Sequence, residues 1–240
     1  MIQSSTSGMQ YFFRGMSMLT HPKLRNYVII PLLINIVLFA ALSWVGYHYF
    51  SQFVHWMDSF IPHWLQWLSW ILWILFAIAD LVIMAYTFTL IANIIAAPFN
   101  SSLSERVQEL ITGEKKSASA LSQVKDIPRS VGRAGLWLLY YIPRAIFFAI
   151  LFLIPGVNAA APFTWFAFNA WVMSVQYMDY PMDNNGHSFK HMRELLSQQR
   201  GTNLGFGSGV LLITMIPIIN FVAMPAAVIG ATLLWCERYK

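Results

Sequence analysis

Residues 27–50, which read YVIIPLLINIVLFAALSWVGYHYF, decide the fold of this chain. The stretch contains no Asp, Glu, Lys or Arg. About 20 residues of helix, each adding about 1.5 Å, cross the hydrocarbon core of a bilayer. We therefore predict that residues 27–50 form a membrane-spanning helix.

A second apolar run covers residues 64–97, and as one helix it would measure about 50 Å. Because this exceeds the hydrocarbon core of roughly 30 Å, we expect the helix to tilt or to project into water. We expect Pro98 to break it. Residues 98–133 then form a predicted cytoplasmic amphipathic segment, in water or on the membrane surface, with apolar residues at helical spacing: Leu103, Val107, Leu110 and Ile111.

Two further apolar regions, 135–178 and 204–235, are each divided by a similar turn sequence. Pro155 and Asn158 mark the first turn, and Pro217 and Asn220 mark the second. The arms of the second region are only about 20 Å long as helices, which is too short to span comfortably. We predict helical hairpins that enter the membrane partway, although the longer arms of the first region would also suit a full crossing. Either an internal duplication or a chance recurrence of turn chemistry explains the likeness of the two turns.

The composition agrees with a membrane protein, since 58% of residues are hydrophobic and 10% are charged, against about a quarter charged in soluble domains. The predicted fold class is an all-α integral membrane protein in which 1–240 form a single membrane domain. It has two long transmembrane helices, two re-entrant hairpins and short amphipathic helices. Every Lys and Arg except Arg144 falls on one side of this arrangement, which predicts that side, with both termini, to be cytoplasmic. The same placement argues against a nucleic-acid partner.

Enzyme chemistry is not expected from this sequence. It contains no GxxxxGK[ST], GxGxxG, HExxH or GxSxG motif, so we expect no enzyme, no cofactor and no hydrolysis of ATP. The single cysteine, Cys236, excludes an intramolecular disulfide. His187 and His191 stand four residues apart, but no arranged carboxylate or thiol completes a tetrahedral set, so we expect no metal.

The residues before the first spanning helix are candidates for an oxyanion site. If Pro22 is the first helical residue, the backbone N–H groups of Lys23, Leu24 and Arg25 would be free at the positive end of the helix dipole. Free N–H groups beside cationic side chains suit sulfate or phosphate. The alternative is that Lys23 and Arg25 only form the basic cytoplasmic flank of the helix.

Arg144 and Asp80 are ionisable residues within apolar runs. A lone charge at mid-membrane costs about 3 kcal/mol on insertion scales, so each needs a partner or a wet cavity, and the two residues would suit each other. Arg144 would line an anion path or extend to the interface. Asp80 would carry a proton or make a structural hydrogen bond.

Glycines at positions 201, 205 and 209 repeat every four residues. This spacing allows helix backbones to approach closely, and it predicts a packing or oligomer contact.

Several strings, in their order and spacing, resemble the CysZ family of bacterial inner-membrane sulfate permeases. The resemblance covers nearly the whole chain. The strings are Tyr11-Phe12 with Arg14-Gly15, Pro22-x-Leu24-Arg25, Val28-Ile29-Ile30-Pro31-Leu32-Leu33-x-Asn35, Ile95-Ala96-Ala97-Pro98-Phe99-Asn100, Pro143-Arg144-Ala145, Ile154-Pro155-Gly156, Gln176-Tyr177-x-Asp179-Tyr180-Pro181-x-Asp183-Asn184, Phe189-Lys190-x-Met192-Arg193 and Met215-Ile216-Pro217-x-x-Asn220.

The resemblance implies two spanning helices, two re-entrant hairpins and a homo-oligomer in the bilayer. It also implies an oxyanion site where the family pattern reads Pro-Gly-apolar-Arg-Arg. In this chain Arg25 and Leu24 match that pattern, whereas Lys23 replaces the glycine and Asn26 replaces the second arginine. The implied sulfate site is therefore Lys23, Leu24, Arg25 and Asn26.

The function that the resemblance implies is sulfate uptake for cysteine synthesis, through a channel-like or gradient-driven path. Two alternatives remain open from the sequence. The first is a non-conducting membrane scaffold or interaction protein, and the second is a transporter of another oxyanion such as sulfite, thiosulfate or molybdate.

Overall fold

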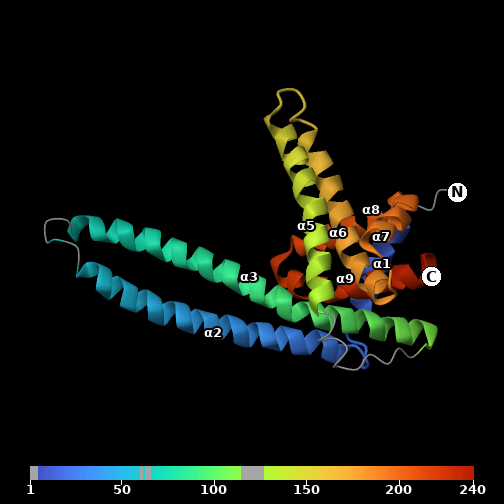
Figure 1. Ribbon diagram of the computed structural model, residues 1–240, viewed down its shortest axis with the longest axis horizontal. Coiled ribbons are helices and arrows are strands. Elements are labelled where there is room, and N and C mark those ends of the chain that lie inside the picture. The colour runs from blue at the N-terminus through green and yellow to red at the C-terminus, as the bar shows by residue number, and fades with distance from the viewer. Residues whose placement is uncertain (1–4, 60–61, 63–65, 115–126) are drawn as a thin grey trace. The chain divides into compact units, whose positions relative to one another are not determined.

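The computed structural model describes residues 5–59, 62, 66–114 and 127–240 (Figure 1). All regular elements in this part of the chain are helices, which confirms the predicted all-α class. They are α1 (Ser5–Ser17), α2 (Arg25–Asp58), α3 (Gln66–Thr112), α5 (Ile127–Ile150), the 3-10 turn η2 (Leu151–Leu153), α6 (Ala161–Asn184), α7 (Phe189–Gln198), α8 (Arg200–Thr214) and α9 (Pro217–Arg238).

The chain divides into two compact units. One, here called the hairpin unit, is Ile29–Ala97. The other, here called the core unit, is Met1–Val28 with Pro98–Lys240. The long helices α2 and α3 therefore each contribute to both units.

The hairpin unit is an antiparallel pair of helices. Phe39 of α2 meets Phe88 of α3 with ring centroids 5.5 Å apart, and nearer the connection Phe53 meets Phe76 at 5.0 Å. The α2 segment Arg25–Phe50 is long and apolar enough to cross a bilayer, with a mean hydropathy of 2.5 and no burial inside the protein. A shorter apolar stretch, Trp73–Thr89, lies on α3. The prediction of an apolar helix over 64–97 is thus confirmed from Gln66 onward, and residues 64–65 lie outside the described residues.

Pro98 does not end a helix, so that prediction was wrong. Helix α3 continues through Pro98 to Thr112. A proline removes one backbone hydrogen bond but does not terminate a helix whose next turns are held by packing. Leu103 and Val107 provide that packing, since both are fully buried in the core unit. Leu110 also packs on the core, whereas Ile111 is exposed, so the predicted apolar face is buried against protein only in part. Residues 115–126 of the predicted segment lie outside the described residues, and 127–133 belong to α5.

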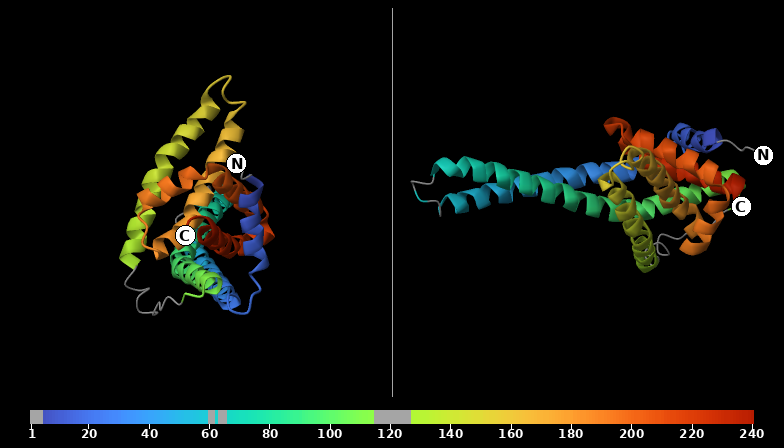
Figure 2. Two further views of the ribbon diagram at one scale, coloured as in Figure 1. Left: turned by 90° about the vertical axis from the view of Figure 1, so that its right-hand side faces the viewer. Right: turned by 90° about the horizontal axis from the view of Figure 1, so that it is seen from above.

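The core unit is built around α1, α6, α8 and α9. Helix α1 packs along α8 and α9, and α6 packs on the same two helices (Figure 2). Phe12, Phe206 and Leu234 are fully buried between these helices. The backbones of some of these helices are almost in contact. At Gly8, for example, an added Cβ would lie 1.9 Å from the Thr202 carbonyl oxygen.

The first predicted turn joins α5 to α6 through residues 154–160. Gly156 has φ +83°, a left-handed conformation that glycine adopts without strain. The Asn158 N–H donates to the Ile154 carbonyl at 3.0 Å, and the Asn158 carbonyl accepts from Ala161 at 3.2 Å. Pro155 and Asn158 therefore lie in a turn, as predicted. The helical segment Gly135–Leu153 before it is long and apolar enough to cross a bilayer.

The second turn is displaced from its predicted position. Only Met215 and Ile216 separate α8 from α9, and Pro217 is the first residue of α9. Asn220 donates its N–H to the Ile216 carbonyl at 2.9 Å as part of the first helical turn. Proline suits this first position because its missing N–H is not needed there. The arms also exceed the predicted lengths, with 15 residues in α8 and 22 in α9.

Candidate functional site

The segment before α2 is the predicted oxyanion site. Helix α2 begins at Arg25, three residues later than expected, and Pro22 lies in the preceding turn. The Leu24 and Arg25 N–H groups both donate to the His21 carbonyl oxygen, at 2.9 and 3.0 Å. The Lys23 N–H donates to His21 Nδ1 at 3.2 Å. The prediction that these three amides are free was therefore wrong, because the turn uses them.

The side chains of this segment differ sharply in burial. Leu24 is fully buried in the core unit and anchors the turn. Lys23, Arg25 and Asn26 are exposed on either side of that anchor. No carboxylate of the described residues forms an ion pair with Lys23 or Arg25. Two uncompensated cations and an amide thus lie at the positive end of the α2 dipole.

Arg144 lines a cavity of about 490 Å³ within the core unit. The walls come from α5, α6, the end of α7 and the start of α8. The lining residues are Tyr140, Arg144, Phe148, Thr164, Ala167, Phe168, Trp171, Ser197, Arg200 and Leu204. A second cation, Arg200, therefore shares the cavity with Arg144.

Contacts with Tyr140 fix the position of Arg144. Arg144 Nη1 donates to the Tyr140 carbonyl at 2.8 Å, and its Cζ lies 4.0 Å from the centre of the Tyr140 ring. The Tyr140 hydroxyl accepts a 2.8 Å hydrogen bond from Trp171 Nε1. Arg193 of α7 also contacts the Tyr140 ring, with Cζ at 4.8 Å. Cation–π contacts of this kind hold a guanidinium without neutralising it.

Asp80 lies half-buried on α3 of the hairpin unit. A Cβ added at Gly46 of α2 would lie 3.6 Å from Asp80 Oδ2. This is an ordinary van der Waals distance, so the Asp80 carboxylate lies beside the α2 backbone at Gly46.

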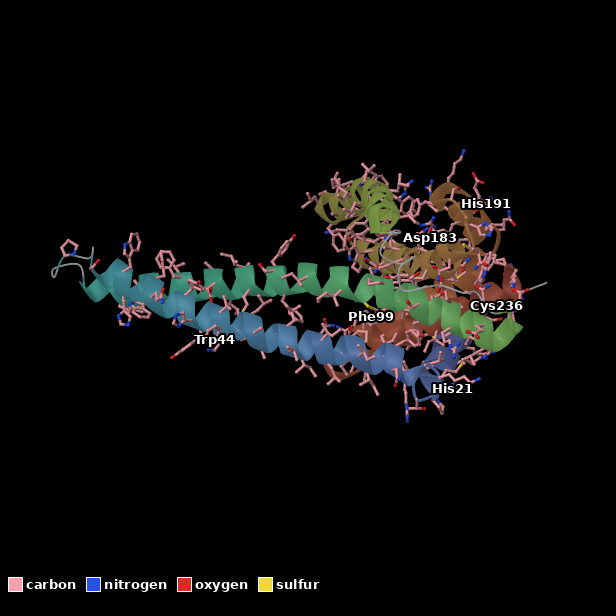
Figure 3. All side chains as sticks on the ribbon, turned by 60° about the horizontal axis from the view of Figure 1, so that its bottom comes forward. His21, Trp44, Phe99, Asp183, His191 and Cys236 are labelled. Carbon is pink, nitrogen blue, oxygen red and sulfur yellow. The ribbon has the colours of Figure 1, made fainter. Side chains whose placement is uncertain are left out.

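The predicted histidine pair is a packing contact. The rings of His187 and His191 are stacked with centroids 5.2 Å apart, and His187 also meets the Trp235 ring at 5.0 Å. Burial lowers the pKa of His187, and the neighbouring His191 and Arg133 act in the same direction. Figure 3 labels His191 on α7 and Asp183 on α6.

Comparison with known proteins identifies the family. Residues 11–225 match the family described as sulfate transporter CysZ/etoposide-induced protein 2.4. The chain belongs to this CysZ family. A relative from Pectobacterium atrosepticum, named sulfate transporter CysZ, is 43% identical over 98% of this chain and 86% of its own length. One from Salmonella typhimurium with the same name is 42% identical over 100% of this chain and 97% of its own length.

Two of the strings that resemble the CysZ family supply polar contacts within the core unit. In the string around Asp179 and Asp183, both carboxylates bind Arg133 of α5. Arg133 Nε and Nη2 donate to Asp179 at 2.9 and 2.6 Å, and Nη1 lies 2.8 Å from Asp183 Oδ1. Nη1 also donates to the His187 carbonyl at 2.7 Å. The guanidinium thus joins α5, α6 and the connection to α7.

The first CysZ-family string joins α1 to the end of the chain. The Tyr11 hydroxyl donates to Glu237 Oε2 at 2.9 Å, and Arg14 donates to both Glu237 carboxylate oxygens at 3.0 and 2.6 Å. Hydrogen bonds from Arg14, opposed by desolvation, lower the pKa of Glu237. A Cβ at Gly15 would lie 2.2 Å from the Ala226 carbonyl oxygen. Contacts of Tyr11, Arg14 and Gly15 therefore hold α1 against α9.

Amides and hydroxyls join α3 to α6 in this CysZ-family core. Ser101 donates to Asn184 Oδ1 at 2.7 Å, and Asn184 Nδ2 returns a bond to the Ser101 carbonyl at 2.9 Å. Gln108 and Asn185 exchange bonds at 3.2 and 2.8 Å. Neither these pairs nor the Arg133 cluster was predicted from the sequence. The signal for them was the polar string 179–184, which directly follows the apolar region 135–178.

Proposed function

We propose that this CysZ-family chain takes up sulfate across the bacterial inner membrane and supplies it for cysteine biosynthesis. The observation that carries the proposal is identity above 40% to proteins named sulfate transporter over nearly the full chain. Exposed apolar helices, which suit lipid, and a cation cluster without carboxylate partners among the described residues support it physically.

Sulfate binds first, in this proposal, at Lys23, Arg25 and Asn26, with Leu24 holding the turn. Because the three amides of the turn are already bonded to His21, the side chains supply the positive groups. Arg25 is the main ligand, since a guanidinium matches the geometry of a tetrahedral oxyanion by donating two parallel hydrogen bonds. Lys23 adds a charge that is less directional.

The proposed topology places both termini in the cytoplasm. The α5–α6 and α8–α9 hairpins enter the bilayer partway from that side, and α2 with α3 spans it. Pro155, Asn158 and the start of α9 at Pro217 and Asn220 then lie within the membrane region, inside a homo-oligomer that covers their backbone. Two further predictions concern ionisable residues: Arg144 lines an anion path, and Asp80 carries a proton or makes a structural hydrogen bond.

Flux of radiolabelled sulfate into proteoliposomes tests the function. We expect uptake above that of empty vesicles, driven by the sulfate gradient alone if the path is channel-like. Uptake that requires an imposed proton gradient would indicate coupling instead. Flux equal to empty vesicles would refute transport and favour a scaffold. Competition by unlabelled sulfite, thiosulfate and molybdate measures selectivity among oxyanions.

Arg25→Ala tests the site, with Lys190→Ala as the matched control. Both changes remove one exposed cation, and Lys190 lies on α7. We expect Arg25→Ala to weaken sulfate binding to the purified protein and Lys190→Ala to leave it unchanged. Equal binding by the parent and Arg25→Ala would place the site elsewhere.

A further inference from the structure

The cavity beside Arg144 has a polar end and an apolar end. Tyr140, Arg144, Ser197 and Arg200 supply the polar groups. Phe148, Ala167, Phe168 and Leu204 supply apolar walls. The lining is therefore amphipathic, and it suits a ligand that has an ionic group joined to a hydrocarbon part.

The polar end is positively charged without compensation. Neither Arg144 nor Arg200 has a carboxylate within ion-pair distance among the described residues, and no Asp or Glu lines the cavity. Arg193 does not line the cavity, but its Cζ lies 4.8 Å from the centre of the Tyr140 ring. The acidic group on α7, Glu194, is exposed and lies 3.8 Å from His191 Nδ1. An anionic group bound here would therefore meet two cations and no carboxylate among the lining residues.

The apolar end argues against a free inorganic anion. A strongly hydrated dianion gains nothing from aromatic and aliphatic walls, whereas an acyl chain does. The outer surface of the same hairpin is also apolar, with Leu139, Leu153 and Phe163 each at least 73% exposed. The helices that form the cavity therefore also carry exposed apolar surface that suits lipid.

Tyr140 and Trp171 indicate the depth in a membrane at which the cavity would lie. Tyr140 and Trp171, joined by a hydrogen bond, carry polar tips on apolar rings, which is typical of the interface between headgroups and acyl chains. Basic pockets between membrane helices at this level bind anionic headgroups. From these observations we propose that the cavity binds an anionic phospholipid. Its phosphate contacts Arg144 and Arg200, and one acyl chain lies along Phe148, Ala167 and Leu204.

This inference depends on the membrane placement in the proposed function but not on sulfate transport. Purified full-length protein is reconstituted with phosphatidylglycerol or with phosphatidylcholine, extracted in mild detergent, and assayed for retained lipid by native mass spectrometry. We expect phosphatidylglycerol to be retained at least fivefold more than phosphatidylcholine. Equal retention of the two lipids would overturn the proposal.

Three variants separate the effect of charge from the effect of cavity shape. Arg144→Gln with Arg200→Gln should abolish the preference for phosphatidylglycerol, and Arg106→Gln with Lys190→Gln, which removes two cations outside the cavity, should preserve it. Ala167→Phe fills the acyl end, keeps both arginines and changes a side chain that is already exposed. It should also reduce phosphatidylglycerol retention at least fivefold.

Inorganic sulfate and phosphate distinguish a lipid from a free anion. We expect neither ion, added alone, to raise the melting temperature of delipidated protein in a way that depends on Arg144 and Arg200. A rise that the double glutamine variant removes, without lipid retention, would make the cavity an inorganic anion site and overturn the lipid assignment. Retention of phosphatidylglycerol in a protein without sulfate flux would leave this inference intact and refute only the transport function.

Discussion

One guanidinium bridges two carboxylates that lie one helical turn apart on α6: Arg133 Nη2 is 2.6 Å from Asp179 Oδ1, and Nη1 is 2.8 Å from Asp183 Oδ1. The Arg133 side chain is only 11% exposed, so water contributes little to its solvation. The carboxylates and the His187 carbonyl take over that role. This cluster links α5 to α6 and to the connection before α7.

Asp179→Asn should destabilise the core unit by about 3 kcal/mol, because it removes one partner of a largely buried ion pair. The melting temperature in detergent should fall by about 6–12 °C. Glu194→Gln is the control, since Glu194 is an exposed acid on α7 and its loss should change stability by less than about 0.5 kcal/mol. If Asp179→Asn and Glu194→Gln have the same melting temperature, Asp183 alone compensates the charge of Arg133.

Gly207→Ala should disrupt the crossing of α8 and α6. A Cβ there would lie 1.7 Å from the Ala170 carbonyl oxygen, which is backbone and cannot swing aside. Overpacking of this kind costs about 1–3 kcal/mol or more, which size-exclusion profiles and melting curves would detect.

The matched control for that crossing is Gly132→Ala on α5, where an added Cβ meets nothing within 4 Å. This change should preserve or raise stability, because alanine favours helix over glycine by up to about 1 kcal/mol. If Gly207→Ala and Gly132→Ala changed stability by the same amount, this would contradict the close approach of the α8 and α6 backbones at Gly207.

The bond between Arg14 and Glu237 predicts a specific sensitivity to acid. The pKa of Glu237 in the folded protein is lowered from its ordinary value of 4.5, mainly by the Arg14 hydrogen bonds. Its stabilising contribution is therefore complete above that ordinary value and is lost as pH falls through the lower folded pKa.

Melting temperatures of the parent and Glu237→Gln, measured from about pH 7 down to about pH 3, test this sign. The parent should be the more stable at neutral pH, and the difference should shrink below the ordinary glutamate pKa. A difference that stays constant or grows in acid would mean that Glu237 is not held ionised by Arg14.

The double change Lys23→Gly with Asn26→Arg restores the family pattern at the proposed sulfate site without changing its net charge. An arginine replaces a lysine as the second cation, and it donates two hydrogen bonds in a fixed plane. We expect sulfate affinity, measured by equilibrium dialysis of the purified protein, to rise about three- to fivefold, a modest gain because the site is exposed. A fall in affinity would show that the Lys23 ammonium is itself the better ligand.

Apolar run lengths predicted most helices correctly, because lipid-facing surface requires long stretches without charge. The positions at which helices begin and end were predicted less reliably. The start of α2 was placed at Pro22, but the His21 carbonyl accepts two turn hydrogen bonds and delays the helix to Arg25. Pro98 was taken as a helix end, whereas burial of Leu103 and Val107 outweighs the one lost backbone bond.

Features that depend on contacts between residues far apart in the sequence could not be predicted from it. Helix α1 was not predicted, since its short mixed sequence becomes a helix by packing on α8 and α9. The glycine repeat at 201, 205 and 209 correctly pointed to packing on α8, and Gly209 does face Met9 and Phe12 of α1. The two glycines at which an added Cβ would lie closest to another helix backbone, Gly8 and Gly207, do not belong to this repeat. The cavity beside Arg144 required the fold, because its second arginine comes from α8.

The seating of α1 on α8 and α9 has a consequence for biosynthesis. Helix α1 packs on α8 and α9, which come much later in the sequence, with backbone meeting backbone at Gly8 and Gly15 and with a bond from Arg14 to Glu237. Phe12 therefore lacks its packing surface until α8 and α9 have been synthesised, and a chain truncated before them exposes this aromatic side chain. Burial of α1 is thus among the last steps of folding, even though α1 is made before the helices that cover it.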